Sequence, residues 1–180
     1  LNGIDVVTFD GNGQFLTNPN DPGLNGEPGV TAFVVVKSNK AKDTDAGILD
    51  TNTPDDNDDD VFGIRYDETG SSSQKSNTIK FGLAAGGTTN SYQTEVDAAV
   101  QTTNPQLITY RYQDGEGNPL VWLDGTSVAT VQASTPTGNL SNSDELFIGR
   151  GPKDGANSGW DGDIAEIVIF GEGLNQAQRT

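Results

Sequence analysis

Hydrophobic residues occur along the chain in short runs of strand length. Each run is rich in Val, Ile, Thr, Tyr and Phe and is bounded by Gly, Asn, Asp, Pro or Ser, a pattern typical of strands separated by turns. The runs are Ile4–Phe9, Gln14–Thr17, Gly29–Ser38, Val61–Tyr66, Thr78–Ala84, Tyr92–Val96, Leu107–Tyr112, Leu120–Leu123, Ser127–Val131, Leu146–Gly149 and Ile164–Phe170. The pattern predicts an all-β protein with about eleven or more strands.

One turn between these runs can be assigned from its residues. Asp124 and Gly125 follow the run Leu120–Leu123, and an Asp-Gly pair supplies the positive φ angles that a type I′ hairpin requires. A longer polar connection, Asp114–Pro119, joins the run Leu107–Tyr112 to the same hairpin. We therefore expect three neighbouring strands in an antiparallel meander.

Three other segments do not resemble strands. Leu174–Arg179 is the one helical candidate and is long enough for one or two turns. Asn18–Pro28 and Asn39–Asp60 are rich in turn-forming or acidic residues, and we expect both to be long exposed loops. The run Ile164–Phe170 carries a single polar residue, Glu166, so its strand should not lie at the edge of a sheet.

Composition narrows the possible chemistry. The chain of 180 residues has 26 acidic and 10 basic side chains, a formal charge of −16, and it lacks Cys, Met and His. Disulfides, thiolate nucleophiles, imidazole metal sites and Ser-His-Asp mechanisms are therefore excluded. A charge this negative repels phosphate backbones, so we expect no nucleic-acid partner, and without a long apolar run we expect no membrane insertion.

Several segments together resemble a known superfamily. Leu146–Gly149, Trp160–Phe170 and Leu174–Arg179 are similar to the closing strands of laminin G-like, pentraxin-like and concanavalin A-like jelly rolls. Tyr110–Val131 looks like the hairpin of that family, and Val7–Leu16 looks like its opening strands. The resemblance implies a two-sheet antiparallel β-sandwich, formed by residues 1–180 as a single domain excised from a longer secreted or cell-surface chain.

An acidic run suggests a metal site. Asp56, Asp58 and Asp60 place carboxylates at alternate positions, as in the first half of a calcium loop. The run is not an EF-hand, because Val61 and Asp67 stand where that motif has Gly and Glu. The alternative is a solvated acidic loop that protects a sheet edge from aggregation.

The resemblance adds further ligands to this site. In laminin G-like domains an aspartate just before such a strand binds calcium at the rim of the sandwich, and Asp59 or Asp60 occupies that position. Pentraxin-like relatives place calcium and ligand groups in a loop that corresponds to Arg150–Trp160. We expect Ca²⁺ as the cofactor, held by residues drawn from Asp56, Asp58, Asp59, Asp60, Asp154, Asn157 and Asp161.

The same loops supply the expected ligand-binding residues. Tyr92 lies in a polar stretch and is an exposed-aromatic candidate, whereas Trp160 has the alternative of packing in the core. The candidates are Tyr92, Arg150, Asp154, Asn157 and Trp160. A further aromatic platform would combine Trp122 with Tyr110 and Tyr112, but cross-strand core packing is the favoured interpretation of Trp122.

These features lead to one expected function with two alternatives. We expect a calcium-dependent, lectin-like module of a bacterial surface protein that binds a glycan or polysaccharide beside neighbouring domains of the same polypeptide. The first alternative is a calcium-stiffened spacer or protein-interaction domain of a large adhesin. The second is a polysaccharide hydrolase or lyase, which would need a carboxylate pair such as Asp161 and Asp163 facing one cleft. We expect no enzyme activity.

Overall fold

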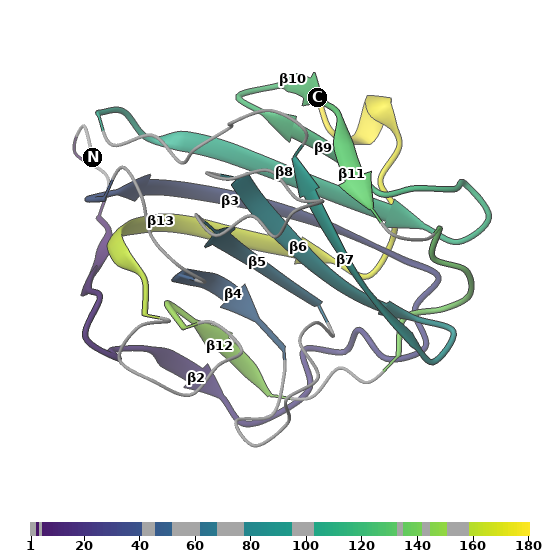
Figure 1. The fold of residues 1–180 in the computed structure, drawn as a ribbon, viewed down its shortest axis with the longest axis horizontal. Helices are drawn as coiled ribbons and strands as arrows, with labels where there is room; N and C mark the ends of the chain where they lie inside the picture. Colours follow the sequence, from purple (N-terminus) through teal and green to yellow (C-terminus); the bar gives the residue numbers. More distant parts are fainter. Residues whose placement is uncertain are drawn as a thin grey trace.

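The computed structural model describes residue 3 and residues 5–40, 46–51, 62–67, 78–94, 103–132, 135–141, 145–150 and 159–180. The side chains of residues 67, 88–94 and 131–132 lie outside this description. Within these ranges the chain forms two antiparallel sheets, one of six strands and one of seven. Figure 1 shows the long strands of the two sheets overlying one another in a flattened sandwich.

Both sheets combine segments that are far apart in sequence. The six-stranded sheet has the order β1 (Val7–Asp10), β13 (Asp161–Phe170), β3 (Gly29–Ser38), β8 (Gln106–Gln113), β9 (Leu120–Leu123) and β10 (Thr126–Val128). The seven-stranded sheet has the order β11 (Thr130–Gln132), β7 (Thr88–Thr94), β6 (Thr78–Ala85), β5 (Phe62–Asp67), β4 (Ala46–Asp50), β12 (Leu146–Ile148) and β2 (Leu16–Asn18). The predicted all-β, two-sheet antiparallel sandwich is confirmed.

The core lies between the two sheets and follows the alternation of the strands. On β3 the four residues Val30, Ala32, Val34 and Val36 are completely buried, because they face the other sheet. The ring of Tyr110, on β8, stacks on Phe81 of β6 with 5.0 Å between the ring centroids, and this contact joins the two sheets. Because the inner faces of both sheets form the core, a ligand can reach only the outer faces of the sheets and the loops.

Four local predictions agree with the structure. Asp124 and Gly125 have φ angles of 50° and 78°, and the strands on either side of them pair with Leu123 opposite Thr126. Strands β8, β9 and β10 are successive neighbours in one sheet, which is the expected meander. The C-terminal segment contains one 3₁₀ turn, Gln176–Gln178. Strand β13 lies between β1 and β3 and is not an edge strand.

Two predictions about strand placement are wrong. Residues 46–50, expected in an exposed loop, form β4, and all five residues are buried. The expected single strand Ser127–Val131 divides into β10 and β11, which belong to different sheets. In both cases the position of the segment between other strands outweighs the local preference of its residues, since Ala46 and Gly47 are poor strand formers by themselves. No helix within the described ranges has the length and hydropathy needed to span a bilayer.

Candidate functional site

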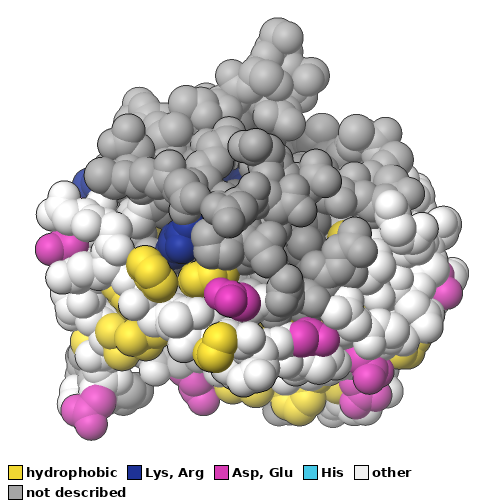
Figure 2. Space-filling model, turned by 90° about the horizontal axis from the view of Figure 1, so that it is seen from below, with side chains coloured by type: hydrophobic (Ala, Val, Ile, Leu, Met, Phe, Trp, Pro, Cys, Tyr) yellow, Lys and Arg dark blue, Asp and Glu magenta, His cyan; other side chains and the backbone are white. Residues whose placement is uncertain are grey.

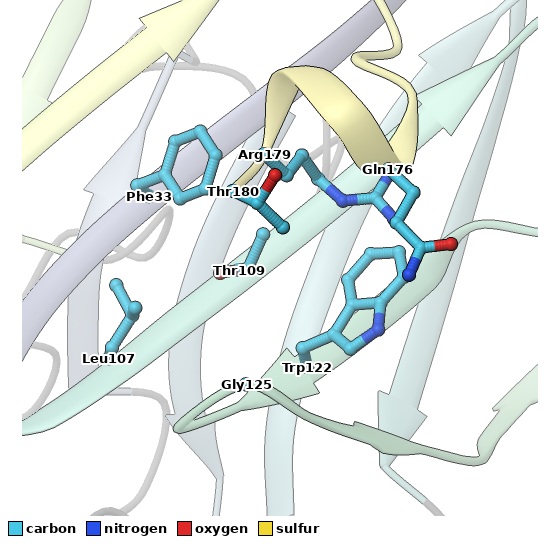
Figure 3. A pocket seen from close by; sticks show the side chains of 8 residues that line it. All are labelled: Phe33, Leu107, Thr109, Trp122, Gly125, Gln176, Arg179 and Thr180. Atoms are coloured by element: carbon cyan, nitrogen blue, oxygen red, sulfur yellow. The ribbon is translucent and has the colours of Figure 1, made fainter.

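A pocket of about 370 Å³ lies on the outer face of the six-stranded sheet. Its floor comes from three strands, and its wall comes from the C-terminal 3₁₀ turn, which crosses this face (Figure 1). The lining residues are Phe33, Leu107, Thr109, Trp122, Gly125, Gln176, Arg179 and Thr180. Figure 3 shows the side chain of Arg179 extending from the turn towards Trp122, with Phe33 and Thr109 nearby. Apolar and hydrogen-bonding groups therefore converge on one opening.

Strand register places the indole of Trp122 on this outer face. Thr109 on β8 is the register partner of Trp122 on β9, so the two side chains point to the same side of the sheet. The adjacent pair, Tyr110 and Val121, points inward and is completely buried. The outward position leaves the indole half-buried, with part of its surface available to a ligand.

This arrangement corrects the sequence-based interpretation of the aromatic residues. Tyr110 and Tyr112 are buried between the sheets, whereas Trp122 lies on the opposite face of its sheet. The three rings therefore form no common platform, and Trp122 does not pack in the core between the sheets, which was the favoured interpretation. The sequence could not show this because the register of β9 against β8 is not fixed by a loop as long as Asp114–Pro119.

Hydrogen bonds from the sheet hold the segment that leads to the pocket wall. Arg111 is only 6% exposed, and its guanidinium donates from Nε to the Leu174 carbonyl at 2.7 Å and from Nη2 to the Gly173 carbonyl at 3.0 Å. Thr31 Oγ1 donates to the Glu172 carbonyl and accepts from the Leu174 amide, both at 2.8 Å. These bonds satisfy buried backbone groups and fix the direction in which the chain enters the turn.

The 3₁₀ turn itself is fixed by a reciprocal cap. Asn175 Oδ1 accepts from the Gln178 amide at 3.1 Å, and Gln178 Oε1 accepts from the Asn175 amide at 2.8 Å. Such a capping box satisfies two backbone donors that would otherwise have no partner at the start of the turn. Gln176, which lies within the box, and Arg179, which directly follows it, are consequently held against the pocket.

Arg179 joins the turn to the floor of the pocket. Its guanidinium carbon lies 4.1 Å from the centroid of the Trp122 ring, a cation–π contact, and Nη1 donates to the Leu174 carbonyl at 2.6 Å. Burial lowers the pKa of Arg179 from its ordinary value, the neighbouring Arg111 lowers the pKa further, and Glu116 raises it. Arginine remains protonated at neutral pH despite such shifts, so the pocket carries a fixed positive charge.

Of the residues expected to bind a metal, Asp161 is described, and it lies on β13 near Asp163. Asp161 Oδ1 accepts from Asn39 Nδ2 at 3.0 Å, and its Oδ2 lies 3.5 Å from the ammonium of Lys40. Asp163 Oδ1 accepts from Thr8 Oγ1 at 2.7 Å. Among the described residues, no three acidic side chains are close enough to hold a metal ion. The two aspartates thus connect neighbouring strands and loops through protein partners.

Most of the expected metal ligands cannot be compared with the structure. Asp56, Asp58, Asp59, Asp60, Asp154 and Asn157 lie outside the described residues. Tyr92 lies in β7 opposite Phe81 and Gln132, but its side chain is also outside the description. The calcium site at these loops therefore stays a prediction.

The two remaining expected ligand-binding residues have well-defined surroundings. Arg150 lies between two aromatic rings, 5.1 Å from the centroid of Phe15 and 4.9 Å from that of Phe147. Figure 2 shows the molecule from below the view of Figure 1, and on this face apolar side chains lie close to a basic one. Trp160, by contrast, is 1% exposed and belongs to the core cluster, so its ring cannot stack on a ligand at the surface. We do not retain Trp160 as a ligand-binding residue.

Sequence reasoning did not identify Arg179, Gln176 or Thr109 as site residues. The available signal was the strict alternation around Thr109, which places apolar side chains on one face and a mixture of Leu107, Thr109 and Arg111 on the other. A Trp that pairs with the mixed face is a candidate for the surface. Nothing in the sequence shows that the C-terminal turn folds onto that face.

The fold and the pocket define the class of this protein: a two-sheet antiparallel sandwich that carries an open pocket on the outer face of one sheet. The family follows from the sequence. The profile of the concanavalin A-like lectin/glucanase superfamily matches residues 10–178, and the chain belongs to that superfamily. The recognised resemblance is confirmed. No curated protein sequence gives a significant match.

Solved structures of similar fold share little sequence with this chain. The carbohydrate-binding module CBM40 of the Ruminococcus gnavus IT-sialidase, bound to α2,3-sialyllactose, aligns with a TM-score of 0.69 and 14% identity over 95% of this chain and 92% of that one. A heptameric pentraxin from Limulus polyphemus aligns with a TM-score of 0.63 and 15% identity, over 93% of this chain and 76% of its own. Identities this low establish the common fold alone.

A third similar structure is domain 4 of an extracellular GH43 arabinanase from Geobacillus stearothermophilus, in complex with arabinotriose. It aligns with a TM-score of 0.60 and 15% identity, over 96% of this chain and 73% of that chain. The sandwich architecture is thus shared with proteins solved together with two chemically different oligosaccharides.

Proposed function

We propose that this protein is a carbohydrate-binding, lectin-like module that holds a glycan in the pocket beside Trp122. The observation that carries the proposal is the composition of the pocket: a half-exposed indole and the ring of Phe33 lie next to hydroxyl, amide and guanidinium groups. Sugar rings have apolar faces that pack on aromatic rings and hydroxyls that need hydrogen-bonding partners. The exposed Gln176 and Thr180 supply such partners.

Two of the structurally similar proteins support the choice of ligand class. The sialidase module was solved with sialyllactose and the arabinanase domain with arabinotriose. Since function does not follow from fold, these complexes add to the argument from the pocket and do not replace it.

The proposal also covers the location of the module, its role in a larger chain and its metal ion. We propose that it is secreted or on a bacterial cell surface, that it attaches a larger chain to a glycan or polysaccharide, and that Ca²⁺ binds at the acidic rim near Asp56, Asp58, Asp59 and Asp60. The charge of −16 supports a protein that stays soluble in salty media. Residues 1–180 would form one domain of that larger chain.

We propose a binding role without catalysis. A glycosidase requires two carboxyl groups across the bound sugar, and within the described part of the chain no Asp or Glu lines the pocket. The aspartates considered for catalysis, Asp161 and Asp163, are each engaged by protein partners at 3.5 Å or less.

The test is glycan binding by the 180-residue chain, screened on an array of plant, microbial and animal oligosaccharides and measured by titration calorimetry for any sugar that binds. Substitution Trp122→Ala should weaken binding by about tenfold or more, since the loss of an aromatic contact of about 1.4 kcal/mol is a tenfold change. The substitution removes the ring surface and the support of Arg179 together.

Leu120→Ala provides the matched control. Leu120 lies on the same strand, points to the same face and is 44% exposed, but it is not part of the pocket lining. Leu120→Ala should bind glycan like the wild type, with both variants checked for unchanged thermal unfolding. If folded Trp122→Ala binds as tightly as the wild type, or no sugar binds at all, this pocket is not a glycan site.

A further inference from the structure

The charge of the pocket is opposite to that of the whole protein. The chain has 26 acidic and 10 basic residues, yet the side chains of the eight described residues that line the pocket include one guanidinium and no carboxylate. Asp124, next to the lining residue Gly125, uses its Oδ1 to accept from the Leu107 amide at 2.9 Å. A local positive charge in a strongly acidic protein favours an anionic group on the bound molecule.

The hydrogen bonds of Arg179 leave one edge of its guanidinium open. Of its five N–H donors, one on Nη1 bonds to the Leu174 carbonyl. Among the described residues this is its one hydrogen bond, and none is made by Nε or Nη2. These two nitrogens lie on the same edge and present two parallel N–H groups, which is the geometry that a carboxylate accepts with both of its oxygens.

The position of the guanidinium is fixed before any ligand binds. It lies against the Trp122 ring with 4.1 Å between the guanidinium carbon and the ring centroid, and the bond to Leu174 holds its other side. A side chain that is already ordered loses little further entropy on binding, so more of the interaction appears as affinity.

Among the described residues, Arg179 has no close anionic partner of its own. Glu116, whose charge raises the pKa of Arg179, has its Oε2 2.7 Å from Nη2 of Arg111 and is paired with that residue. Arg111 itself adds a like charge near Arg179. A ligand carboxylate at the open edge would therefore compensate a charge that the protein compensates only in part.

We propose that the glycan held by this pocket carries a carboxylate, as uronic and other acidic sugars do, and that Arg179 binds it through Nε and Nη2. The proposal rests on the glycan-binding function proposed above and names its ligand class. The planar, two-oxygen shape of the carboxylate matches the guanidinium edge, while the exposed Gln176 and Thr180 remain available to the sugar hydroxyls.

The test compares sugars that differ only in this charge. Titration calorimetry with the 180-residue chain would use trigalacturonic acid against its methyl ester, and 3′-sialyllactose against lactose. For at least one of the pairs, the wild type should bind the free acid about tenfold or more tightly than its neutral counterpart, because a charge-assisted bidentate pair is worth about 1.4 kcal/mol or more. Arg179→Gln should abolish that preference and retain weak binding of the neutral sugar.

Lys80→Gln is the control for net charge, since Lys80 lies on β6 of the other sheet and is absent from the pocket lining. It should leave the preference for the acid unchanged. Equal binding of acid and neutral sugar by the wild type, or an unchanged preference in folded Arg179→Gln, would overturn the carboxylate assignment while leaving glycan binding intact. A sulfated galactan oligosaccharide that binds more tightly than both acids would also overturn it. Loss of all sugar binding would remove the proposed function itself.

Discussion

At the scale of single residues, Tyr112 connects a buried ring to the loop that follows β11. Its hydroxyl donates to the Gly138 carbonyl at 2.8 Å, and the Gly138 amide donates to Asp114 Oδ1 at 2.7 Å. Burial raises the pKa of Tyr112 above its ordinary value, and the charge of Asp114 raises it further. The folded protein therefore holds the phenolic proton more tightly than the unfolded chain does.

This difference predicts how stability changes at alkaline pH. The stabilisation is complete below the pKa of the unfolded chain, about 10, and is lost as the pH rises towards the higher pKa of the folded state. Tyr112→Phe should cost about 1 kcal/mol at pH 8 through the lost hydrogen bond. Its free energy of unfolding should then fall less steeply than that of the wild type above pH 10.

The measurement is urea unfolding of both proteins at several values between pH 8 and pH 11. All other tyrosines are common to the two proteins, so the difference between the curves belongs to Tyr112. Parallel curves over this range would contradict the raised pKa.

Residue-scale features could be predicted where a local rule fixes them. The Asp124-Gly125 turn was identified because positive φ angles require particular residue types, and both angles are positive in the structure. The orientation of Trp122 was not, because its face depends on the register between β8 and β9 and a one-residue change of register would reverse it. The pairing of Arg179 with Trp122 joins residues 57 positions apart and leaves no local signal.

At the scale of elements, the C-terminal segment and the six-stranded sheet depend on each other. The segment gives up backbone hydrogen bonding within a sheet, and Arg111 supplies donors to two of its carbonyls, those of Gly173 and Leu174. Leu174 is 5% exposed, so these carbonyls lie where water has little access. The order of the pocket wall therefore depends on the hydrogen bonds from Arg111 to these two carbonyls.

Replacement of Arg111 should loosen the wall and destabilise the fold. Arg111→Met keeps the aliphatic part of the side chain but leaves the buried carbonyls with fewer donors, and we expect a loss of about 2–4 kcal/mol in the free energy of unfolding. Glycan affinity should also fall, because Gln176 and Arg179 follow directly after the released segment. Chemical unfolding and titration calorimetry measure the two effects.

Glu116→Gln tests whether the hydrogen bonds from Arg111 to the two carbonyls, or its ion pair with Glu116, hold the C-terminal segment. The Glu116 side chain is 56% exposed, and an ion pair of this kind contributes about 1 kcal/mol or less. A loss in Glu116→Gln as large as that in Arg111→Met would show that the charge pair, and not the hydrogen bonds to the carbonyls, holds the segment.

Strands in which apolar and polar residues alternate could be predicted from the sequence. Strands that are buried only because other strands lie on both sides of them could not. Strand β3 has the bounds expected from the sequence, since its alternate residues are completely buried. Strand β4 was missed because its five residues include Ala46 and Gly47 and follow a polar stretch, so their burial results from the adjacent strands β5 and β12. The short helix expected at the C-terminus is present as a 3₁₀ turn.

At the scale of the whole molecule, the large negative charge has opposite effects on the solubility of the protein and on the stability of its folded state. A formal charge of −16 on 180 residues favours solubility but destabilises the compact state through mutual repulsion. Simple salt screens that repulsion over about 10 Å at 0.1 M, so added NaCl should raise the thermal midpoint gradually. A cation bound at one site would instead raise the thermal midpoint until that site is saturated. The two effects can therefore be separated by their concentration dependence.

The calcium proposal makes a definite prediction on this background. At constant ionic strength, millimolar Ca²⁺ should raise the thermal midpoint more than equal Mg²⁺ does, and EGTA should reverse the increase. A ligand that binds only the folded state adds RT ln(1 + [L]/Kd), about 2.7 kcal/mol at one hundred times Kd. Asp58→Asn with Asp60→Asn should remove most of the calcium-specific increment, because their carboxylates are the hard oxygen donors that Ca²⁺ prefers.

The control removes the same charge elsewhere, with Asp5→Asn and Glu172→Gln, two exposed acidic residues distant in sequence from the acidic run. This variant should gain stability through reduced repulsion and keep the full calcium increment. Equal effects of Ca²⁺ and Mg²⁺ in the wild type, or an increment lost equally in both double variants, would mean that calcium acts only by screening. The acidic run would then be a solvated loop, and glycan binding at the pocket would need no metal, since Trp122 and Arg179 are held by protein contacts alone.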